Sequence, residues 1–313
     1  MPEYTGLEYF KLAVFYASYL YFPAAALLIW AIARRAGFFR WACVIAFCGL
    51  SALAYARFIE PRILLTVEHD IELKRCFAGA GEVRLAVFSD THQGLFGNVM
   101  PIDRIVRRVN ASNPDAVLIA GDLTSMLHPE KFDKTFAALG DLSAPAFAVL
   151  GNHDGHRKAP AYLKALSDAL GEYGVDVIDN ERVTEKIGGA EIEFAGLSDW
   201  RVARPNRSVI APETENPRFL LVHNPKAVFR LPANPHVDLF IAGHTHGGQI
   251  YLPGLTCWLV RFACAVDRYG FAGLGKVEAF VTSGTGMSGL PLRFNMPPRI
   301  DMLNVRYKAC SKE

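Results

Sequence analysis

Ala146-Phe147-Ala148-Val149-Leu150-Gly151-Asn152-His153-Asp154 joins an apolar run to three consecutive polar side chains, and the expected fold follows outward from this stretch. The apolar run predicts a buried strand, and the glycine predicts a sharp turn where that strand ends. The amide, imidazole and carboxylate that follow each need a partner at the mouth of a buried strand. A metal site supplies such partners, so we expect this turn to belong to one.

Four other apolar runs also end in aspartate or histidine. They cover residues 83–89, 115–120, 219–222 and 237–242, and the polar residues after them are Asp90 and His92, Asp122, His223, and His244 and His246. Helical patterns separate the strands in the first half of the chain, which predicts an α/β fold with a buried, mostly parallel sheet. Ligands bind beyond the carboxyl ends of the strands in such a sheet. The five strand ends therefore predict one common site.

The candidate metal ligands offer oxygen and imidazole donors and no thiolate. They are Asp90, His92, Asp122, Asn152, His223, His244 and His246. This donor set suits Mn, Fe or Zn in a reactive site rather than a structural zinc. Two cations about 3.5–4 Å apart need a bridging group, and the Asp122 carboxylate is suited to that position. Taken singly, each residue is equally well a turn aspartate or a core histidine, but five of the nine histidines fall at these strand ends.

In this order the motifs resemble the calcineurin-like metallophosphoesterase superfamily over about residues 83–307. The motifs are Asp90-X-His92, Gly121-Asp122, Gly151-Asn152-His153-Asp154, His223 and Gly243-His244-X-His246. Residues 121–124, 223–225, 243–249 and 286–291 are similar to a membrane-associated bacterial branch that includes YkuE-type phosphodiesterases and membrane-anchored UDP-2,3-diacylglucosamine hydrolases. The resemblance implies a four-layer α/β/β/α sandwich and two divalent metal ions. One ion would be held by Asp90, His92 and His246, the other by Asn152, His223 and His244, with Asp122 between them.

His153 follows a ligand position without being a ligand in the resemblance. We expect it to donate a proton to the leaving oxygen or to hydrogen-bond the phosphoryl group, with Asp154 orienting it. Loss of such an acid typically costs on the order of 10²–10⁴ in rate. The implied reaction is in-line hydrolysis, in which the cations acidify a water molecule and neutralise charge on phosphoryl oxygens. A purely structural turn histidine is the alternative. His156, Arg157 and Arg293 are further candidates for phosphate contact.

The N-terminal fifth of the chain is far more apolar than the rest. Residues 12–33 contain no charged side chain and would span about 33 Å as a helix, and a shorter apolar segment follows at about 38–56. We expect a transmembrane helical hairpin as a membrane anchor over residues 1–62 and a catalytic domain over residues 63–313. A signal peptide followed by a buried helix is disfavoured, because the first stretch is long for a signal sequence and no basic n-region precedes it.

The short loop of this hairpin carries Arg34, Arg35 and Arg40. The positive-inside rule places such a loop in the cytoplasm. The catalytic domain would then lie on the extracytoplasmic side of a bacterial inner membrane. If the second segment only lies in the interface, the domain is cytoplasmic instead.

Charge and cysteine usage exclude some other functions. The net charge is +2 and there is no basic tract with interleaved aromatics, so we expect no nucleic-acid partner. Cys43 and Cys48 lie in an apolar segment, and the remaining four cysteines lack the CxxC spacing of a zinc ribbon, which leaves their pairing open.

We therefore expect a metal-dependent phosphodiesterase or pyrophosphatase. Its substrate would be membrane-derived or amphiphilic, including nucleotide-linked lipids such as UDP-diacylglucosamine. Apolar residues near the site support this, unless they form an ordinary core element; they are Leu255, Trp258, Leu259, Val260 and Phe262. The alternatives are an anchored phosphatase of soluble substrates and a non-catalytic scaffold, which the intact ligand set disfavours. The oligomeric state stays open.

Overall fold

Two six-stranded β-sheets form the centre of the protein, which the computed structural model describes over residues 4–97, 99–155, 160–259, 268–274 and 277–311. The first sheet has the order β1 (Leu65–Phe77), β14 (Arg299–Ala309), β2 (Gly81–Phe88), β4 (Ala116–Ala120), β6 (Ala146–Val149) and β7 (Val175–Val177). The second has the order β12 (Gly270–Leu274), β13 (Val277–Val281), β11 (Leu239–Ala242), β10 (Arg218–Val222), β9 (Ala190–Leu197) and β8 (Arg182–Ile187). A small sheet pairs β3 (Gln93–Gly94) with β5 (Thr124–Ser125).

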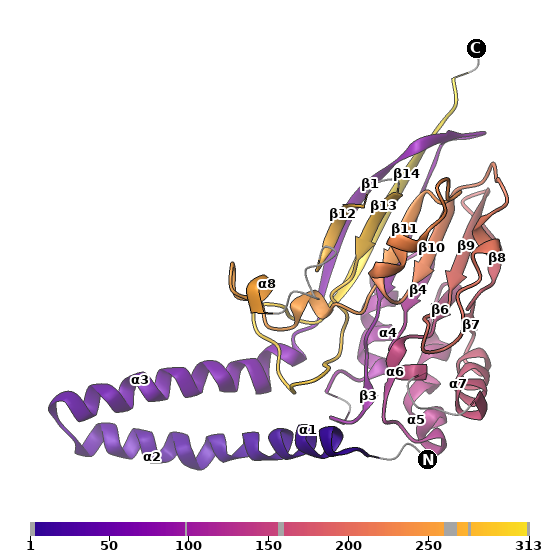
Figure 1. The fold of residues 1–313 in the computed structure, drawn as a ribbon. Coiled ribbons are helices and arrows are strands. Elements are labelled where there is room, and N and C mark those ends of the chain that lie inside the picture. Colours follow the sequence, from indigo (N-terminus) through magenta and orange to yellow (C-terminus); the bar gives the residue numbers. More distant parts are fainter. Residues whose placement is uncertain (1–3, 98, 156–159, 260–267, 275–276, 312–313) are drawn as a thin grey trace.

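The two sheets pack face to face, and helices cover their outer faces (Figure 1). Leu85, Leu118 and Phe147 of the first sheet meet Phe194 and Phe219 of the second in the core between them. The outer face of the first sheet packs against α4 (Ile102–Asn110), α5 (Phe132–Phe136) and α7 (Pro160–Glu172), and η4 (Pro129–Lys131) and η5 (Ala137–Asp141) flank α5. The second sheet packs against the short 3-10 helices η6 (Arg207–Ile210) and η7 (Pro225–Arg230). The predicted α/β/β/α sandwich is confirmed.

Most strand pairs within the two sheets are parallel, as predicted. The antiparallel pairs are β14 with β2 in the first sheet and β12 with β13 and β8 with β9 in the second. The C-terminal strand β14 lies between β1 and β2, which are consecutive in sequence. The position of β14, the strand β12 and the small sheet were not predicted, because no local pattern in the sequence encodes them.

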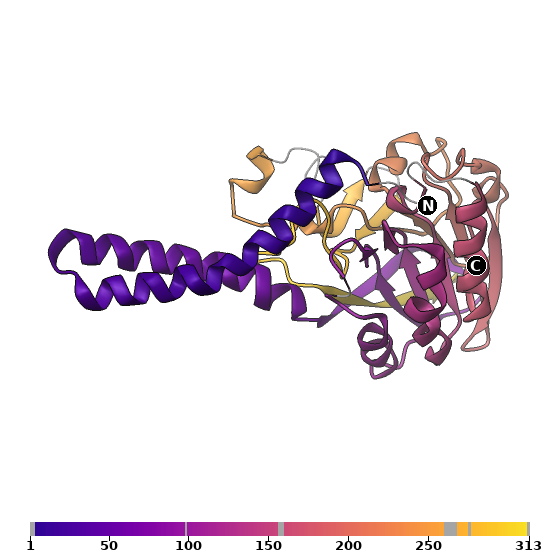
Figure 2. The same cartoon turned by 90° about the horizontal axis from the view of Figure 1, so that it is seen from below.

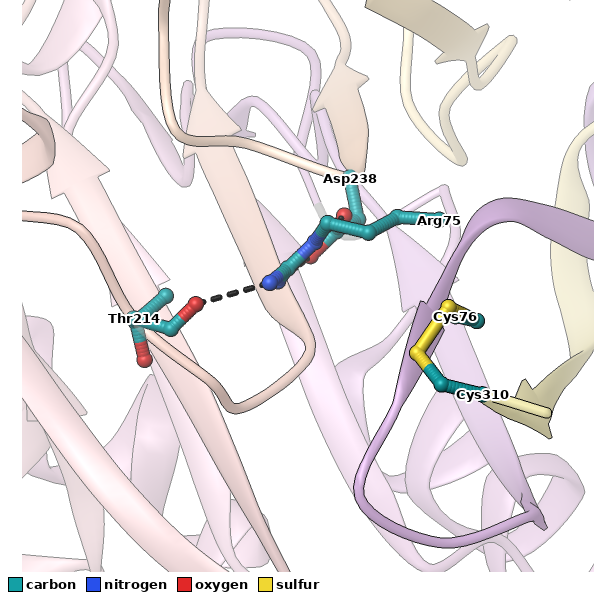
Figure 3. Close-up of a disulfide and its surroundings, with 5 residues drawn as sticks. All are labelled: Arg75, Cys76, Thr214, Asp238 and Cys310. Carbon is teal, nitrogen blue, oxygen red and sulfur yellow. Dashed lines mark hydrogen bonds and ion pairs between the residues drawn. A yellow bond between two sulfur atoms is a disulfide. The ribbon is translucent and has the colours of Figure 1, made fainter. Parts of the chain in front are cut away.

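A disulfide between Cys76 and Cys310 closes the far end of the first sheet, where β1 and β14 finish (Figure 3). Beside it, the guanidinium of Arg75 donates to the Asp238 carboxylate at 2.7 Å and to the Thr214 carbonyl oxygen at 2.7 Å. These contacts join the end of β1 to loops of the second sheet. The pairing that the sequence left open is thus settled for one pair of cysteines.

Two long apolar helices form an antiparallel hairpin that projects away from the sheets (Figures 1 and 2). The first, of 29 residues, comprises α1 (Gly6–Ala17), η1 (Ser18–Leu20) and α2 (Tyr21–Arg34); the second, of 26 residues, comprises α3 (Gly37–Ala54), η2 (Tyr55–Ile59) and η3 (Glu60–Arg62). Both helices extend beyond the predicted segments. Phe38, Trp41 and Ile45 are 82%, 68% and 72% exposed. In water these side chains would form part of a large exposed apolar surface, which is unfavourable. The hairpin therefore indicates membrane association.

The N-terminal half of the first helix packs against the part of the chain that forms the two sheets. Leu12 and Phe15 of α1 pack against a small cluster that includes Phe96, and the Phe15 and Phe96 rings stack with centroids 5.5 Å apart. The buried Arg57 guanidinium lies 4.1 Å from the Phe15 ring centroid, and its Nε donates to Ser18 Oγ at 3.0 Å. The first helix thus contacts the loop that follows His92, and Arg57 joins the two helices of the hairpin.

Candidate metal centre

Five strand ends meet at one edge of the two sheets and bring all seven predicted ligands together. Strand β2 leads to Asp90 and His92, β4 to Asp122, β6 to Asn152 in the one-turn helix α6 (Asn152–Gly155), β10 to His223, and β11 to His244 and to His246, which begins η8 (His246–Gly248). The strands are buried on both faces, so their runs of apolar residues stop where the polar residues emerge at the edge.

Three residues form the first part of the cluster. Asp90 Oδ1 lies 3.3 Å from His246 Nε2, and the Nε2 atoms of His246 and His92 lie 3.0 Å apart. His92 Nε2 also lies 3.6 Å from Asp122 Oδ2. All three side chains are almost fully buried, so their donor atoms point at one small volume.

The second part of the cluster surrounds His223. Its Nε2 lies 3.3 Å from Asp122 Oδ2, 3.1 Å from Asn152 Oδ1 and 3.1 Å from His244 Nδ1. Its Nδ1 donates to the Ala120 carbonyl oxygen at 2.8 Å, which leaves the Nε2 lone pair facing the cluster when the ring is neutral. Asp122 Oδ2 therefore faces both parts.

These donor atoms fit divalent cations better than they fit one another. Two imidazole nitrogens that face each other at about hydrogen-bond distance satisfy each other only if one keeps its proton. The buried Asp90 Oδ1 accepts no hydrogen bond from any residue that the structure describes. A carboxylate oxygen buried in this way needs a cation or a donor. Oxygen and imidazole donors of this kind suit Mn, Fe or Zn.

The backbone at the strand ends is in an unusual conformation. Asp90, His92, Asp122, His244 and His246 have φ angles of 53°, 46°, 54°, 71° and 52°. Non-glycine residues rarely adopt this left-handed region, at a cost of about 1–3 kcal/mol each. Such strain persists only where the surrounding structure enforces it and concentrates at functional sites. Five of the seven candidate ligands share it, and no motif in the sequence shows it.

Gly151 is required for a different reason from the one predicted. Its φ is not in the left-handed region, so the turn does not depend on glycine's backbone freedom. A Cβ placed there would instead collide with the Asp122 carboxylate and lie 2.5 Å from the Asp122 backbone nitrogen. The missing side chain makes room for the group that lies between the two parts of the cluster.

His153 and Asp154 occupy different places in this turn. The His153 ring meets the His92 ring edge to face at 4.7 Å, and its Nε2 lies 3.5 Å from Ser288 Oγ. The fully buried Asp154 carboxylate accepts hydrogen bonds from the backbone of Thr124 at 2.8 Å and of Gly151 at 3.0 Å. These bonds tie two strand ends together. We predicted that Asp154 orients His153. This stays a prediction, and the effect would pass through the backbone of the turn.

The charges in the cluster favour an added cation. Burial raises the pKa of the Asp122 carboxyl, but His223 and His92 outweigh it and hold that pKa below its usual value. Burial lowers the pKa of His223, yet Asp122 and Asp90 outweigh it and raise the pKa to about 10. Burial and the charge of His223 lower the pKa of His244 to about 4. The two carboxylates thus attract positive charge, which a proton on His223 provides when no metal is bound.

A cavity of about 540 Å³ opens beside the cluster. Asn152, His153, His223 and His244 form one side of it. Its other walls carry five basic side chains, which are Lys11, Arg201, Arg207, Lys226 and Arg230. These five were not predicted from the sequence, because single basic residues spread over α1, one loop and the short helices η6 and η7 show no recognisable spacing.

Several other predicted contacts are not found at the site. Arg293 is fully buried, donates to the carbonyl oxygens of Gly286 at 2.7 Å and Met296 at 2.9 Å, and places its Nη2 3.4 Å from His246 Nδ1, so it braces the C-terminal loop behind this candidate ligand. Leu255 and Trp258, at the exposed helix α8 (Thr256–Leu259), do not line the described cavity. His156, Arg157, Val260 and Phe262, and the side chain of Leu259, lie outside what the structure describes.

Burial of Asp179 near this site should make stability depend on pH. Desolvation raises the pKa of this carboxyl to about 7, and its Oδ1 accepts a hydrogen bond from the Leu150 backbone at 3.3 Å. The folded protein therefore holds the proton more tightly than the unfolded chain. The contribution of this carboxyl to the free energy of unfolding is lost as pH rises from about 4 to about 7. Asp179→Asn keeps the acceptor and is expected to melt at a higher temperature than the wild type at pH 8.

That difference should shrink at pH 5, where the folded wild type is already protonated. Circular dichroism melts at both pH values measure it. Asp176→Asn on the neighbouring exposed strand position serves as the control. If Asp179→Asn raised the melting temperature equally at pH 5 and pH 8, the raised pKa of Asp179 would be contradicted.

The strand-end cluster, the strained ligand backbone and the two facing sheets define a metal-dependent phosphoester hydrolase. The calcineurin-like phosphoesterase family model matches residues 83–248, and the chain belongs to this family.

Particular relatives support the same class. The chain is 30% identical to the uncharacterized metallophosphoesterase YkuE of Bacillus subtilis, over 80% of this chain and 89% of that protein. It is 28% identical to phosphodiesterase YaeI of Escherichia coli, over 82% of this chain and 93% of that protein. It is also 28% identical to a transmembrane protein with a metallophosphoesterase domain from Danio rerio, over 77% of this chain and 57% of that protein.

Proposed function

We propose that the protein is a phosphodiesterase that uses two divalent metal ions, Mn, Fe or Zn. Asp90, His92 and His246 would hold one ion and Asn152, His223 and His244 the other, with Asp122 between them. The observation that carries the proposal is the position of Asp122 Oδ2, which lies within 3.6 Å of His92 Nε2 and 3.3 Å of His223 Nε2. A carboxylate that faces both halves of the cluster is what a bridged pair of cations requires.

The bound cations would activate water and neutralise charge on the phosphoryl oxygens. The remaining work falls to the protein's own side chains. His153 lines the cavity next to Asn152, so it is placed to donate a proton to the leaving oxygen. Burial lowers the pKa of His153, Asp122 opposes this, and the Lys11 ammonium lowers the pKa further. Asp154 holds the turn that carries the ring.

We further propose an amphiphilic, membrane-derived phosphodiester as the substrate, a class that includes nucleotide-linked lipids such as UDP-diacylglucosamine. The support is the arrangement of residues 1–62 as an anchor whose first helix lines the same cavity as His153. The name of the Escherichia coli relative, phosphodiesterase YaeI, supports the phosphodiester part of this proposal. An anchored phosphatase of soluble substrates is the alternative.

Substrate profiling of the detergent-solubilised full chain tests the activity. Bis-p-nitrophenyl phosphate is expected to be hydrolysed faster than p-nitrophenyl phosphate, and a micellar lipid phosphodiester faster than its water-soluble headgroup diester. Chelation should abolish all turnover, and added Mn²⁺ should restore it. A preference for monoesters, or activity that survives chelation, would contradict the proposal.

We place the catalytic domain, residues 63–313, on the extracytoplasmic side of the inner membrane. The hairpin loop carries Arg34 and Arg35, which favours a cytoplasmic loop. The Cys76–Cys310 disulfide points to the same side, because disulfides persist in oxidising compartments. In an Escherichia coli host, alkaline phosphatase fused to the C-terminus is expected to be active and a green fluorescent protein fusion dark. The reverse pattern would place the domain in the cytoplasm.

A further inference from the structure

Helix α1 presents both of its charged residues to the catalytic domain, together with the apolar Leu12 and Phe15. Glu8, Lys11, Leu12 and Phe15 are half-buried, at the spacing of one helical face. The opposite face exposes aromatic side chains such as Tyr9 and Phe10, at 64% and 59%. Glu8 and Lys11 are the charged residues of α1, and both line the cavity beside the cluster.

The length of the first helix places α1 at the membrane surface. Its 29 residues extend about 43 Å, whereas the hydrocarbon core of a bilayer is about 30 Å thick. The surplus corresponds to roughly nine residues. Leu7, Glu8 and Lys11, near the start of α1, line the cavity, and Leu12 and Phe15 pack on the domain. Lys11 therefore lies where a lipid headgroup would meet the cavity, outside the hydrocarbon core.

The cavity lining contains more basic than acidic side chains. Its five basic side chains face the two carboxylates of Glu8 and Asp199. Glu8 accepts from the Thr5 backbone at 2.9 Å as part of a capping box, and Asp199 accepts from the Arg201 backbone at 2.9 Å. Among the residues that the structure describes, no acidic side chain pairs with Lys11. Its ammonium acts on the neighbouring Glu8 carboxylate but is not held in an ion pair with any described residue, so it can contact an anionic ligand.

Two groups of residues from different parts of the chain line this cavity. The cluster of Asn152, His223 and His244 takes the phosphoryl group that is cleaved. Lys11 lines the same cavity from helix α1, which belongs to the hairpin and not to the strand ends. A cavity of about 540 Å³ is far larger than one phosphoryl group needs.

We propose that Lys11 binds a second anionic group of the substrate, so that the membrane anchor supplies a substrate-binding residue to the active site. The inference rests on the proposed phosphodiesterase function. It assigns specificity for phosphoesters that carry an additional negative charge beside the cleaved phosphate. It also makes α1 part of the site rather than only a tether.

Competitive inhibition by AMP and ADP tests this assignment, because the two differ by one phosphate. The full chain hydrolyses bis-p-nitrophenyl phosphate at a fixed free Mn²⁺ concentration. Lys11→Ala is expected to raise the Ki of ADP about tenfold, the effect of losing one charge-assisted hydrogen bond. The Ki of AMP should change less than about twofold. Lys11→Arg should restore ADP inhibition, and Lys164→Ala, on the exposed face of α7, should change nothing.

An equal rise in Ki for AMP and ADP, or no rise for either, would overturn the proposal. Lys11→Gln keeps most of the side-chain length and is expected to behave as Lys11→Ala, which covers the case in which the alanine variant does not fold. If the wild type proves inactive, ADP and AMP binding are followed by calorimetry with the same variants. A failure of the proposed function is then distinguishable from a failure of the assignment of Lys11.

Discussion

Asp122→Asn is expected to lower kcat for bis-p-nitrophenyl phosphate at least 100-fold and to reduce the bound metal. Loss of an outer partner of a metal ligand alone costs about 10–100-fold in affinity or activity, and Asp122 lies inside the cluster. The change removes the negative charge that faces His92 and His223. Asparagine keeps an oxygen that can accept the His153 backbone N–H, now bonded to Asp122 Oδ1 at 2.7 Å. The variant therefore tests the negative charge of Asp122 separately from the hydrogen bond by which this side chain supports the turn at His153.

Metal content by mass spectrometry and steady-state kinetics measure the two effects together. Asp103→Asn is the matched control, because Asp103 lies on the exposed face of α4 and pairs only with Arg107 among the described residues. Circular dichroism should show that both variants fold. An Asp122→Asn protein with full metal content and near-normal kcat would contradict the bridging role of this carboxylate.

His153→Gln is expected to lower the rate on the order of 10²–10⁴-fold for diesters with an alkyl alcohol leaving group. An alkoxide needs a proton as it leaves, whereas p-nitrophenolate is stable without one. The loss for bis-p-nitrophenyl phosphate should therefore be much smaller. This dependence on the leaving group distinguishes a proton donor from a residue that only binds the phosphoryl group.

The geometry also allows His153 to be a metal ligand instead of a proton donor. Measuring the metal content of the variant decides between the two roles. His92, Asp122 and His153 each offer a donor atom within 4.8 Å of the others. If His153 is the acid, His153→Gln keeps its full complement of metal. A large loss of metal, with equal rate losses for both kinds of leaving group, would make it a ligand instead. His128→Gln, at a distant loop histidine that pairs with Glu130, is the control.

The amino-acid sequence by itself determined the reaction class and the seven candidate ligands. Polar residues such as Asp122 and His223 directly follow apolar runs, and this local break in pattern is visible without a structure. Parallel strands place their carboxyl ends at one edge, so the runs could be expected to meet. The hairpin was equally visible, because its helices are defined by continuous apolar length.

Only the tertiary structure decided how these parts combine. The left-handed backbone at Asp90 and His246 and the space left by Gly151 depend on neighbours far away in sequence. The insertion of β14 between β1 and β2 likewise joins the two ends of the catalytic domain. The contact between Phe15 and Phe96 brings Lys11 to the cavity, although nothing near Lys11 in the sequence marks it as part of a site. Local patterns fix which residues are polar and where strands end, whereas packing between distant segments fixes which of them share a site.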